Sequence, residues 1–196
     1  MITALHGFLG LPSDWNFLGA GVRAINLWNE EIPSEGDVLL GYSMGGRLAL
    51  QALMRGARYR KAVIVSAGID RGEPSPWVAR FENEPWPELM KAWHAQPLFG
   101  GHEMERREED FDRAVLVHAL RDWSAAVLPP PELERIAIPV LWVAGARDAK
   151  YVEIAQRAAK RTPHGELWIV EDAGHRVPWE RPERFAARLR EFAAAQ

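Results

Sequence analysis

A serine lies in a sequence context that could make it a nucleophile. Ser43 is the centre of a G-x-S-x-G pattern, Gly41-Tyr42-Ser43-Met44-Gly45, which follows the apolar run Val38-Leu39-Leu40 and precedes a helix-like stretch. In this context the pattern predicts a sharp turn from strand to helix that exposes the serine hydroxyl, with glycines where side chains would clash. The alternative interpretation is a serine that only caps the following helix.

The chain also contains the two partners that such a serine requires. Serine is a poor nucleophile at neutral pH, so it needs a base within hydrogen-bonding reach and a group that fixes the tautomer of that base. Asp148 follows the apolar run 140–144, and His175 follows the next apolar run, 167–170. Serine, aspartate, histidine is the chain order expected for a nucleophile on a strand-to-helix turn. We therefore predict catalytic roles for Ser43, Asp148 and His175.

Each partner has rivals in the sequence. Asp172 lies near His175, but two carboxylates so close together would not both suit the role, and we prefer Asp148. The other histidines lack the combination of strand end, preceding glycine and downstream position that His175 has: His6, His94, His102, His118 and His164.

A second loop is expected to complete the site. Leu5-His6-Gly7-Phe8-Leu9-Gly10 follows the first apolar run. Its backbone amides could meet a developing oxyanion together with the N–H of the residue after the nucleophile, and we assign this pair to Phe8 and Met44. For the His6 side chain we favour a structural role in shaping the loop.

Composition restricts the classes of function. The chain has 196 residues, 47% of them apolar, which suits one domain with its own core. Lysine and arginine number 24 against 27 acidic residues, so no electrostatic footprint for nucleic acid is present. Cysteine is absent, which excludes disulfides and thiolate chemistry and fits a reducing compartment. No apolar run approaches the ~20 residues needed to span a bilayer. We expect a cytoplasmic protein that acts on small molecules; its oligomeric state is left open.

The order of the predicted elements favours an α/β fold with a mostly parallel sheet. Six short runs predict strands at 2–5, 24–27, 38–42, 62–66, 140–144 and 167–170. Helix-like stretches lie between or after them at 44–55, 152–161 and 182–194. Strands that alternate with helices indicate βαβ units and hence parallel pairing.

The segment at about 70–131 interrupts this alternation. It carries four tryptophans and many charges, and it has helix-like patterns without a strand pattern. It ends at Pro129-Pro130-Pro131, which stops helix formation. We expect a helical lid inserted between two strands of a single domain.

Together these motifs resemble the α/β-hydrolase superfamily over nearly the whole chain. A narrower resemblance, to the 2-succinyl-6-hydroxy-2,4-cyclohexadiene-1-carboxylate synthase family of menaquinone biosynthesis, rests on four stretches: Leu5 to Gly10 with Asp14-Trp15, Gly41 to Arg47, Trp77 to Phe99, and Arg147 to Tyr151. The resemblance implies a lyase in which the activated serine abstracts a proton and pyruvate is eliminated from a cyclohexene intermediate. It implies neither a cofactor nor a metal.

The position of Arg47 relative to Ser43 favours the same anionic substrate as the resemblance does. It lies four positions after Ser43 on the predicted helix, so the two side chains share a face and the guanidinium can point back toward the serine. A guanidinium binds a carboxylate through two parallel hydrogen bonds, which suits the anionic substrate that the resemblance implies. The alternative role is a structural salt bridge to the lid.

The resemblance implies further substrate-binding residues in the lid and beside the nucleophile. These are Tyr42, a tryptophan matching Trp93, and lid arginines, of which Arg71 is the best candidate for the first. Arg107 or Arg113 could be the other, whereas Arg80 and Arg106 are interpreted as surface charge. Aromatic side chains in a lid more often serve packing, so Trp93 depends on the resemblance.

The sequence also departs from the family, and two other functions remain open. The family's N-terminal hairpin is missing, and 28–37 is too short for the long helix expected there, so a compact sheet is predicted. The runner-up function is a carboxylesterase or thioesterase that forms an acyl-enzyme on Ser43. A hydrolase-fold protein that binds without catalysis is disfavoured, because such proteins commonly lose one of the three residues and this chain keeps them all.

Overall fold

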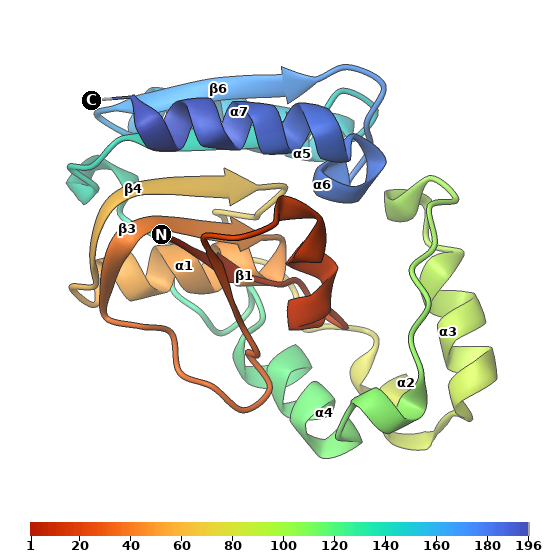
Figure 1. Cartoon of the computed structure of the whole chain (residues 1–196). Coiled ribbons are helices and arrows are strands. Elements are labelled where there is room, and N and C mark those ends of the chain that lie inside the picture. The colour runs from red at the N-terminus through yellow and green to blue at the C-terminus, as the bar shows by residue number, and fades with distance from the viewer. Residues whose placement is uncertain (196) are drawn as a thin grey trace.

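The computed structural model describes residues 1–195 and is built on a six-stranded sheet in which neighbouring strands are parallel (Figure 1). The strands lie in the order β2-β1-β3-β4-β5-β6. Their bounds are β1 Ile2–Leu5, β2 Val22–Ile25, β3 Glu35–Tyr42, β4 Arg58–Val65, β5 Val140–Gly145 and β6 Gly165–Val170. A parallel sheet needs both faces covered, and the helices provide that cover.

Two apolar clusters fill the space on either side of the sheet. On one face, Leu39 and Trp142 belong to the same cluster as Leu50 of α1 (Met44–Met54) and Ala158 of α5 (Ala149–Arg161). On the other face, the strands pack against the 3-10 helix η1 (Pro12–Leu18) and α7 (Pro182–Ala194), which contributes Phe185. Figure 1 shows α7 lying along β6, with the short α6 (Val177–Glu180) before it.

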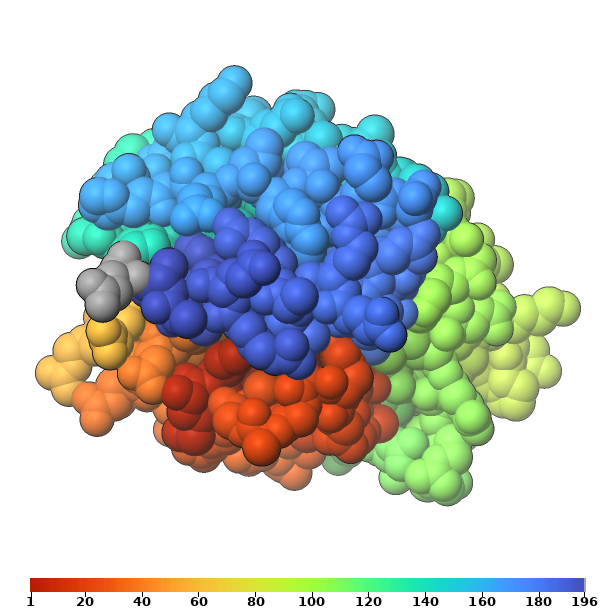
Figure 2. All heavy atoms as spheres, turned by 45° about the horizontal axis from the view of Figure 1, so that its top comes forward, coloured from red at the N-terminus to blue at the C-terminus, as the bar shows by residue number. Residues whose placement is uncertain are grey.

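The chain between β4 and β5 contains several helices and no strand. It contains α2 (Val78–Asn83), α3 (Trp86–His94) and α4 (Arg113–Asp122), with short 3-10 helices η2 (Pro97–Phe99), η3 (Glu108–Asp110) and η4 (Leu133–Arg135). We call residues 70–131 the helical segment. It has its own apolar cluster around Phe81 and Leu89, which also includes Leu9. Figure 1 shows α3 beyond the ends of the strands, and Figure 2 shows the segment in green beside the C-terminal part in blue.

The predicted elements are all present, but several boundaries differ. The strand predicted at 24–27 runs from Val22 to Ile25, because the Leu27 N–H leaves the ladder and donates to the His6 ring. The helix predicted at 152–161 begins earlier, at Ala149, directly after Asp148. None of the helices within residues 1–195 combines the length and the apolar composition of a membrane-spanning segment.

Candidate active site

The turn between β3 and α1 holds Ser43 in a rarely adopted backbone conformation. Its φ is 51° and its ψ is −112°, and its N–H donates to the Val65 carbonyl at 2.8 Å. A Cβ on Gly41 would lie 2.6 Å from the Gly45 carbonyl oxygen, and a Cβ on Gly45 would collide with the His6 carbonyl. The predicted strand-to-helix turn is therefore present, and its glycines are required by close approach of the backbone.

Ser43, His175 and Asp148 come from three separate segments and lie in hydrogen-bonding contact. His175 Nε2 is 3.2 Å from Ser43 Oγ, and His175 Nδ1 is 2.7 Å from Asp148 Oδ2. The other oxygen of Asp148 accepts a hydrogen bond from the Tyr151 N–H in the first turn of α5, at 3.4 Å. The rival carboxylate, Asp172, is exposed. The structure thus brings the three predicted residues together.

The environment of His175 favours a neutral imidazole. Its side chain is 1% exposed, and this burial lowers its pKa below the ordinary 6.5, although the hydrogen bond to Asp148 opposes the shift. Asp148 can only accept when ionised, so His175 Nδ1 carries the hydrogen and Nε2 is left as an acceptor for the Ser43 hydroxyl. This is the tautomer that a general base for Ser43 requires.

A buried carboxylate that sequence reasoning missed fixes the His175 loop. One oxygen of Glu180 accepts from the Gly174 N–H (2.9 Å) and from Arg147 (2.8 Å), and the other accepts from the Arg176 N–H (3.0 Å). Glu180 therefore bonds the residues on both sides of His175 and ties them to the residue before Asp148. Its place five residues after His175 gives no recognisable motif for this role.

The loop after β1 is held by His6, as the structural interpretation predicted. His6 Nδ1 donates to the Gly7 carbonyl (2.8 Å), and its Nε2 accepts from the Leu27 N–H (3.0 Å). Burial lowers the pKa of His6 to about 4, so the ring is neutral and both nitrogens are used within the loop. The loop places Phe8 in the same cavity as Ser43 and Met44.

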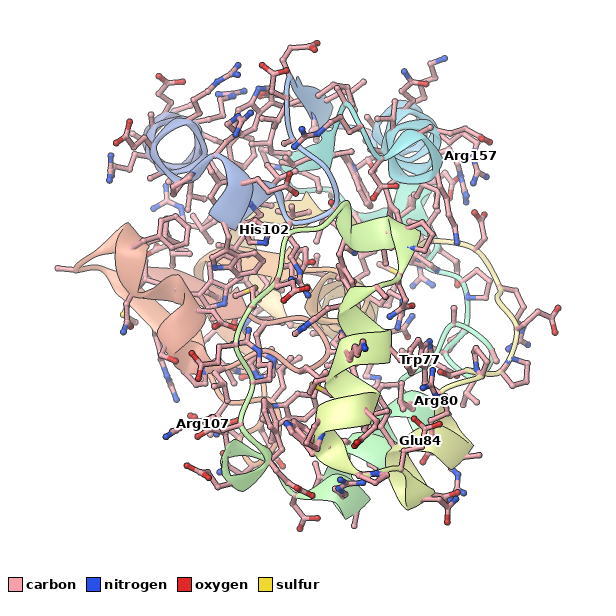
Figure 3. The ribbon with its side chains drawn as sticks, turned by 90° about the vertical axis from the view of Figure 1, so that its right-hand side faces the viewer. Trp77, Arg80, Glu84, His102, Arg107 and Arg157 are labelled. Carbon is pink, nitrogen blue, oxygen red and sulfur yellow. The ribbon has the colours of Figure 1, made fainter. Side chains whose placement is uncertain are left out.

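That cavity has a volume of about 250 Å³ and lies between the site and the helical segment. Ser43 and His175 line it from the sheet side, and Trp93 and Leu98 line it from the helical segment. Figure 3 looks onto this end of the molecule, with α3 in front. The Trp93 ring packs against the rings of Phe8 and Trp77 at centroid distances of 5.1 and 4.8 Å, so it lines the cavity and also belongs to an aromatic cluster.

Arg47 lines the same cavity and is not used in a structural salt bridge. Its Nη2 donates to the Trp123 carbonyl at 3.3 Å, and its buried Nε has no hydrogen-bond partner. Burial lowers its pKa. No carboxylate within residues 1–195 forms an ion pair with it. The alternative of an ion pair to the helical segment is thus wrong, because the contact there is a backbone carbonyl.

Most of the lid arginines considered from sequence lie outside the cavity. Arg71 is exposed and donates to the Ala126 carbonyl, so the structure does not bring this predicted residue to the site. Arg107, at the periphery in Figure 3, pairs with Asp110, and Arg80 pairs with Glu84. Arg113 likewise bonds within the helical segment.

Two arginines that were not predicted as ligands do line the cavity. Arg106, interpreted from sequence as surface charge, is 9% exposed and pairs with Asp14 at 2.7 Å. Arg176 is buried, and its guanidinium lies 4.0 Å from the centroid of the Phe99 ring. In the sequence, only its position directly after His175 points to Arg176. Nothing near Arg106 in the sequence points to the cavity, because its partner, Asp14, is remote in the chain.

The Tyr42 side chain lies beside the triad. Tyr42 is buried, lines the cavity, and has its ring centroid 5.5 Å from that of His175. Burial raises the pKa of its hydroxyl, while the charge of Arg176 opposes this.

Within the described residues, no group of three or more histidines and carboxylates is arranged to hold a metal ion.

Comparison with known proteins finds similarity to a synthase, to MenH and to a lactone-degrading enzyme. The chain is 25% identical to the 2-succinyl-6-hydroxy-2,4-cyclohexadiene-1-carboxylate synthase of Serratia proteamaculans, over 96% of this chain and 91% of the relative. The solved structure of MenH from S. aureus superposes with a TM-score of 0.81 at 20% identity, covering 97% of this chain and 92% of MenH. The structure of Est816, described as an N-acyl homoserine lactone degrading enzyme, gives a TM-score of 0.65 at 25% identity, covering 97% and 92%.

A family model also matches most of the chain. The model of the alpha/beta hydrolase family matches residues 4–188, which include the turn at Ser43, the end of β5 with Asp148 and the loop with His175. The six-stranded parallel sheet agrees with this assignment. The chain belongs to the alpha/beta hydrolase family.

Proposed function

We propose that the protein is a lyase of the 2-succinyl-6-hydroxy-2,4-cyclohexadiene-1-carboxylate synthase type, which eliminates pyruvate from a cyclohexene polycarboxylate, with Ser43, His175 and Asp148 as its catalytic triad. The observation that carries the proposal is the partly buried guanidinium of Arg47, which has a buried Nε and no carboxylate partner and lies in the same cavity as Ser43. A general esterase has no need of such a cation. The Serratia relative, aligned over 96% of this chain, supports the same activity.

The triad geometry supports proton transfer through Ser43. His175 Nε2 accepts the hydroxyl proton of Ser43, and Asp148 stabilises the imidazolium that forms. The Ser43 oxygen takes a proton from substrate carbon, the released electron pair forms a new ring double bond, and the bond to pyruvate breaks with its pair leaving as the enolate. Ser43 is then a hydroxyl again, and the proton held on His175 passes to the departing enolate, so the triad is regenerated.

The charge that develops on the substrate needs donors that are already in position. The backbone N–H groups of Phe8 and Met44 are proposed for this role, because both residues line the cavity beside Ser43. Arg47 binds a substrate carboxylate, and Tyr42 and Trp93 contribute to the walls. The helical segment acts as a lid that excludes water from this space.

An ester hydrolase is the second candidate, and one observation favours it. Est816 is described as an N-acyl homoserine lactone degrading enzyme, and it is 25% identical to this chain over 97% of this chain's length. In that reaction Ser43 would attack the carbonyl carbon and form an acyl-enzyme, for which the same triad suffices. The triad therefore does not separate the two reactions, whereas Arg47 does.

Replacing Arg47 with methionine is expected to separate the two functions. Methionine keeps the apolar stem but loses the charge, so turnover of the polycarboxylate should fall about 10- to 100-fold, as expected for losing one or two charge-assisted hydrogen bonds. Hydrolysis of p-nitrophenyl butyrate, a neutral ester, should change less than about threefold. Parallel measurement of pyruvate release and p-nitrophenol release checks this. An equal loss on both substrates would remove the proposed role of Arg47.

The pH dependence of kcat/KM should report the buried His175. A protonated imidazole cannot accept the Ser43 proton, so activity should be lost as pH falls. Because burial lowers the pKa of His175 in the free enzyme, the midpoint of this acid limb should lie below pH 6.5. The rate should therefore be at its plateau at pH 7.5. An acid limb centred above pH 6.5 would show that a different group, or a differently placed His175, controls the reaction.

A further inference from the structure

The residue after the proposed base places a second cation in the cavity. Arg176 precedes α6, and its backbone is fixed by the hydrogen bond from its N–H to Glu180. Its guanidinium lies over the Phe99 ring and donates to the His102 carbonyl. Figure 3 shows His102 on the stretch of the helical segment that follows α3. The side chain therefore extends from the sheet side to the helical segment across one wall of the cavity.

Three arginines line the cavity, and only one of them forms an ion pair. Arg106 forms an ion pair with Asp14. No carboxylate within residues 1–195 pairs with Arg176, whose side-chain hydrogen bond goes to a backbone carbonyl, and the same holds for Arg47. Buried charges are usually paired, because burial removes the water that would otherwise stabilise them. The carboxylates of Asp14 and Glu73 also line the cavity, but neither forms an ion pair with Arg47 or Arg176. Both arginines can therefore contact the carboxylates of a ligand.

The two free guanidinium groups reach the cavity from different elements. Arg47 comes from α1 and contacts Trp123, after α4, whereas Arg176 comes from the loop between β6 and α6 and contacts His102, after α3. Ser43 directly precedes α1, which carries Arg47, and His175 directly precedes Arg176; all four residues line the cavity. A substrate that contacts both arginines is thereby oriented by two points relative to the Ser43–His175 pair.

We propose that Arg176 is a specificity-determining residue that binds a second carboxylate of the substrate, so that the cavity selects dicarboxylates over monocarboxylates. This role of Arg176 rests on the proposed function, because the cavity beside Ser43 is taken as the substrate site. Arg176 would be a second carboxylate-binding residue of that site, besides Arg47. The guanidinium lies over the Phe99 ring, and those of its N–H groups that do not bond the His102 carbonyl can contact a carboxylate.

The test measures binding, so it does not depend on turnover. Straight-chain dicarboxylates from succinate to suberate are titrated against monocarboxylates of equal length, with tryptophan fluorescence as readout, since Trp93 and Trp179 line the cavity. The wild-type protein should bind its best dicarboxylate at least about tenfold more tightly than the matching monocarboxylate. In Arg176→Met this ratio should fall to near one, with monocarboxylate affinity little changed. Arg176→Lys should restore part of it.

Controls separate recognition from a structural effect. Arg157→Met removes an arginine on α5 that pairs with Asp70 and does not line the cavity, and it should keep the wild-type ratio (Arg157 is labelled in Figure 3). An unchanged ratio in Arg176→Met would overturn the proposal. So would an equal loss of affinity for both acid classes, because that pattern means that Arg176 only supports the cavity wall. A dicarboxylate preference without pyruvate release would keep Arg176 as the second carboxylate site and remove the lyase.

Discussion

Replacing Ser43 with alanine should lower kcat/KM for pyruvate release by about 10⁴- to 10⁶-fold, in the range seen when a triad nucleophile is removed. The reason is that the Oγ atom, 3.2 Å from His175 Nε2, is the group that exchanges a proton with the substrate in the proposed reaction. The fold should persist, because the turn is stabilised by the backbone of Ser43 and by its glycines. Single-turnover and steady-state assays of pyruvate release provide the measurement.

Ser66 offers a matched control for this substitution. It lies directly after β4, has a φ of 48°, is buried, and its hydroxyl has no hydrogen-bond partner within the described residues. Ser66→Ala therefore removes the same atom from a similar backbone conformation without touching the proposed chemistry. It should keep near-normal activity. Near-normal activity in Ser43→Ala, in contrast, would rule out Ser43 as the catalytic serine.

The Asp148→Asn substitution should have the second-largest effect, about 10³- to 10⁴-fold on kcat. An amide can donate to His175 Nδ1 and so favours the tautomer in which Nε2 carries the hydrogen, which cannot accept the Ser43 proton. It also removes the negative charge that stabilises the imidazolium, at a distance of 2.7 Å. Steady-state kinetics of pyruvate release between pH 6 and 9 measures the loss.

The corresponding change in the neighbouring loop is the control. Asp172 is exposed and has a φ of 59°, a conformation that asparagine tolerates well. Asp172→Asn should therefore change kcat less than about twofold. If Asp172→Asn impaired catalysis while Asp148→Asn did not, the third member of the triad would be misassigned.

Local patterns in the sequence predicted most of what positions the reacting groups. Alternation of apolar runs and helical patterns gave the six parallel strands, and strand ends marked where Ser43, Asp148 and His175 would lie. These residues are predictable because each depends on the end of one strand, and the carboxyl ends of parallel strands meet at one edge.

The wall contributed by the helical segment was harder to predict. The sequence predicts Arg71 as a ligand from its position ahead of Trp77, but its hydrogen-bond partner is the Ala126 carbonyl at the surface. Arg106 is brought into the cavity by Asp14, 92 positions away in sequence, and neither residue signals the other. Such contacts depend on how the helices pack against the sheet, which a pattern within one segment does not encode.

Release of pyruvate from the cyclohexene intermediate tests the proposed function most directly. The wild-type enzyme would be mixed with this intermediate, prepared chemoenzymatically, and pyruvate followed by a coupled assay, with p-nitrophenyl acetate and butyrate measured alongside. The proposed lyase predicts rapid pyruvate formation and feeble ester hydrolysis. Brisk ester cleavage without pyruvate would contradict it and would make the protein an ester hydrolase.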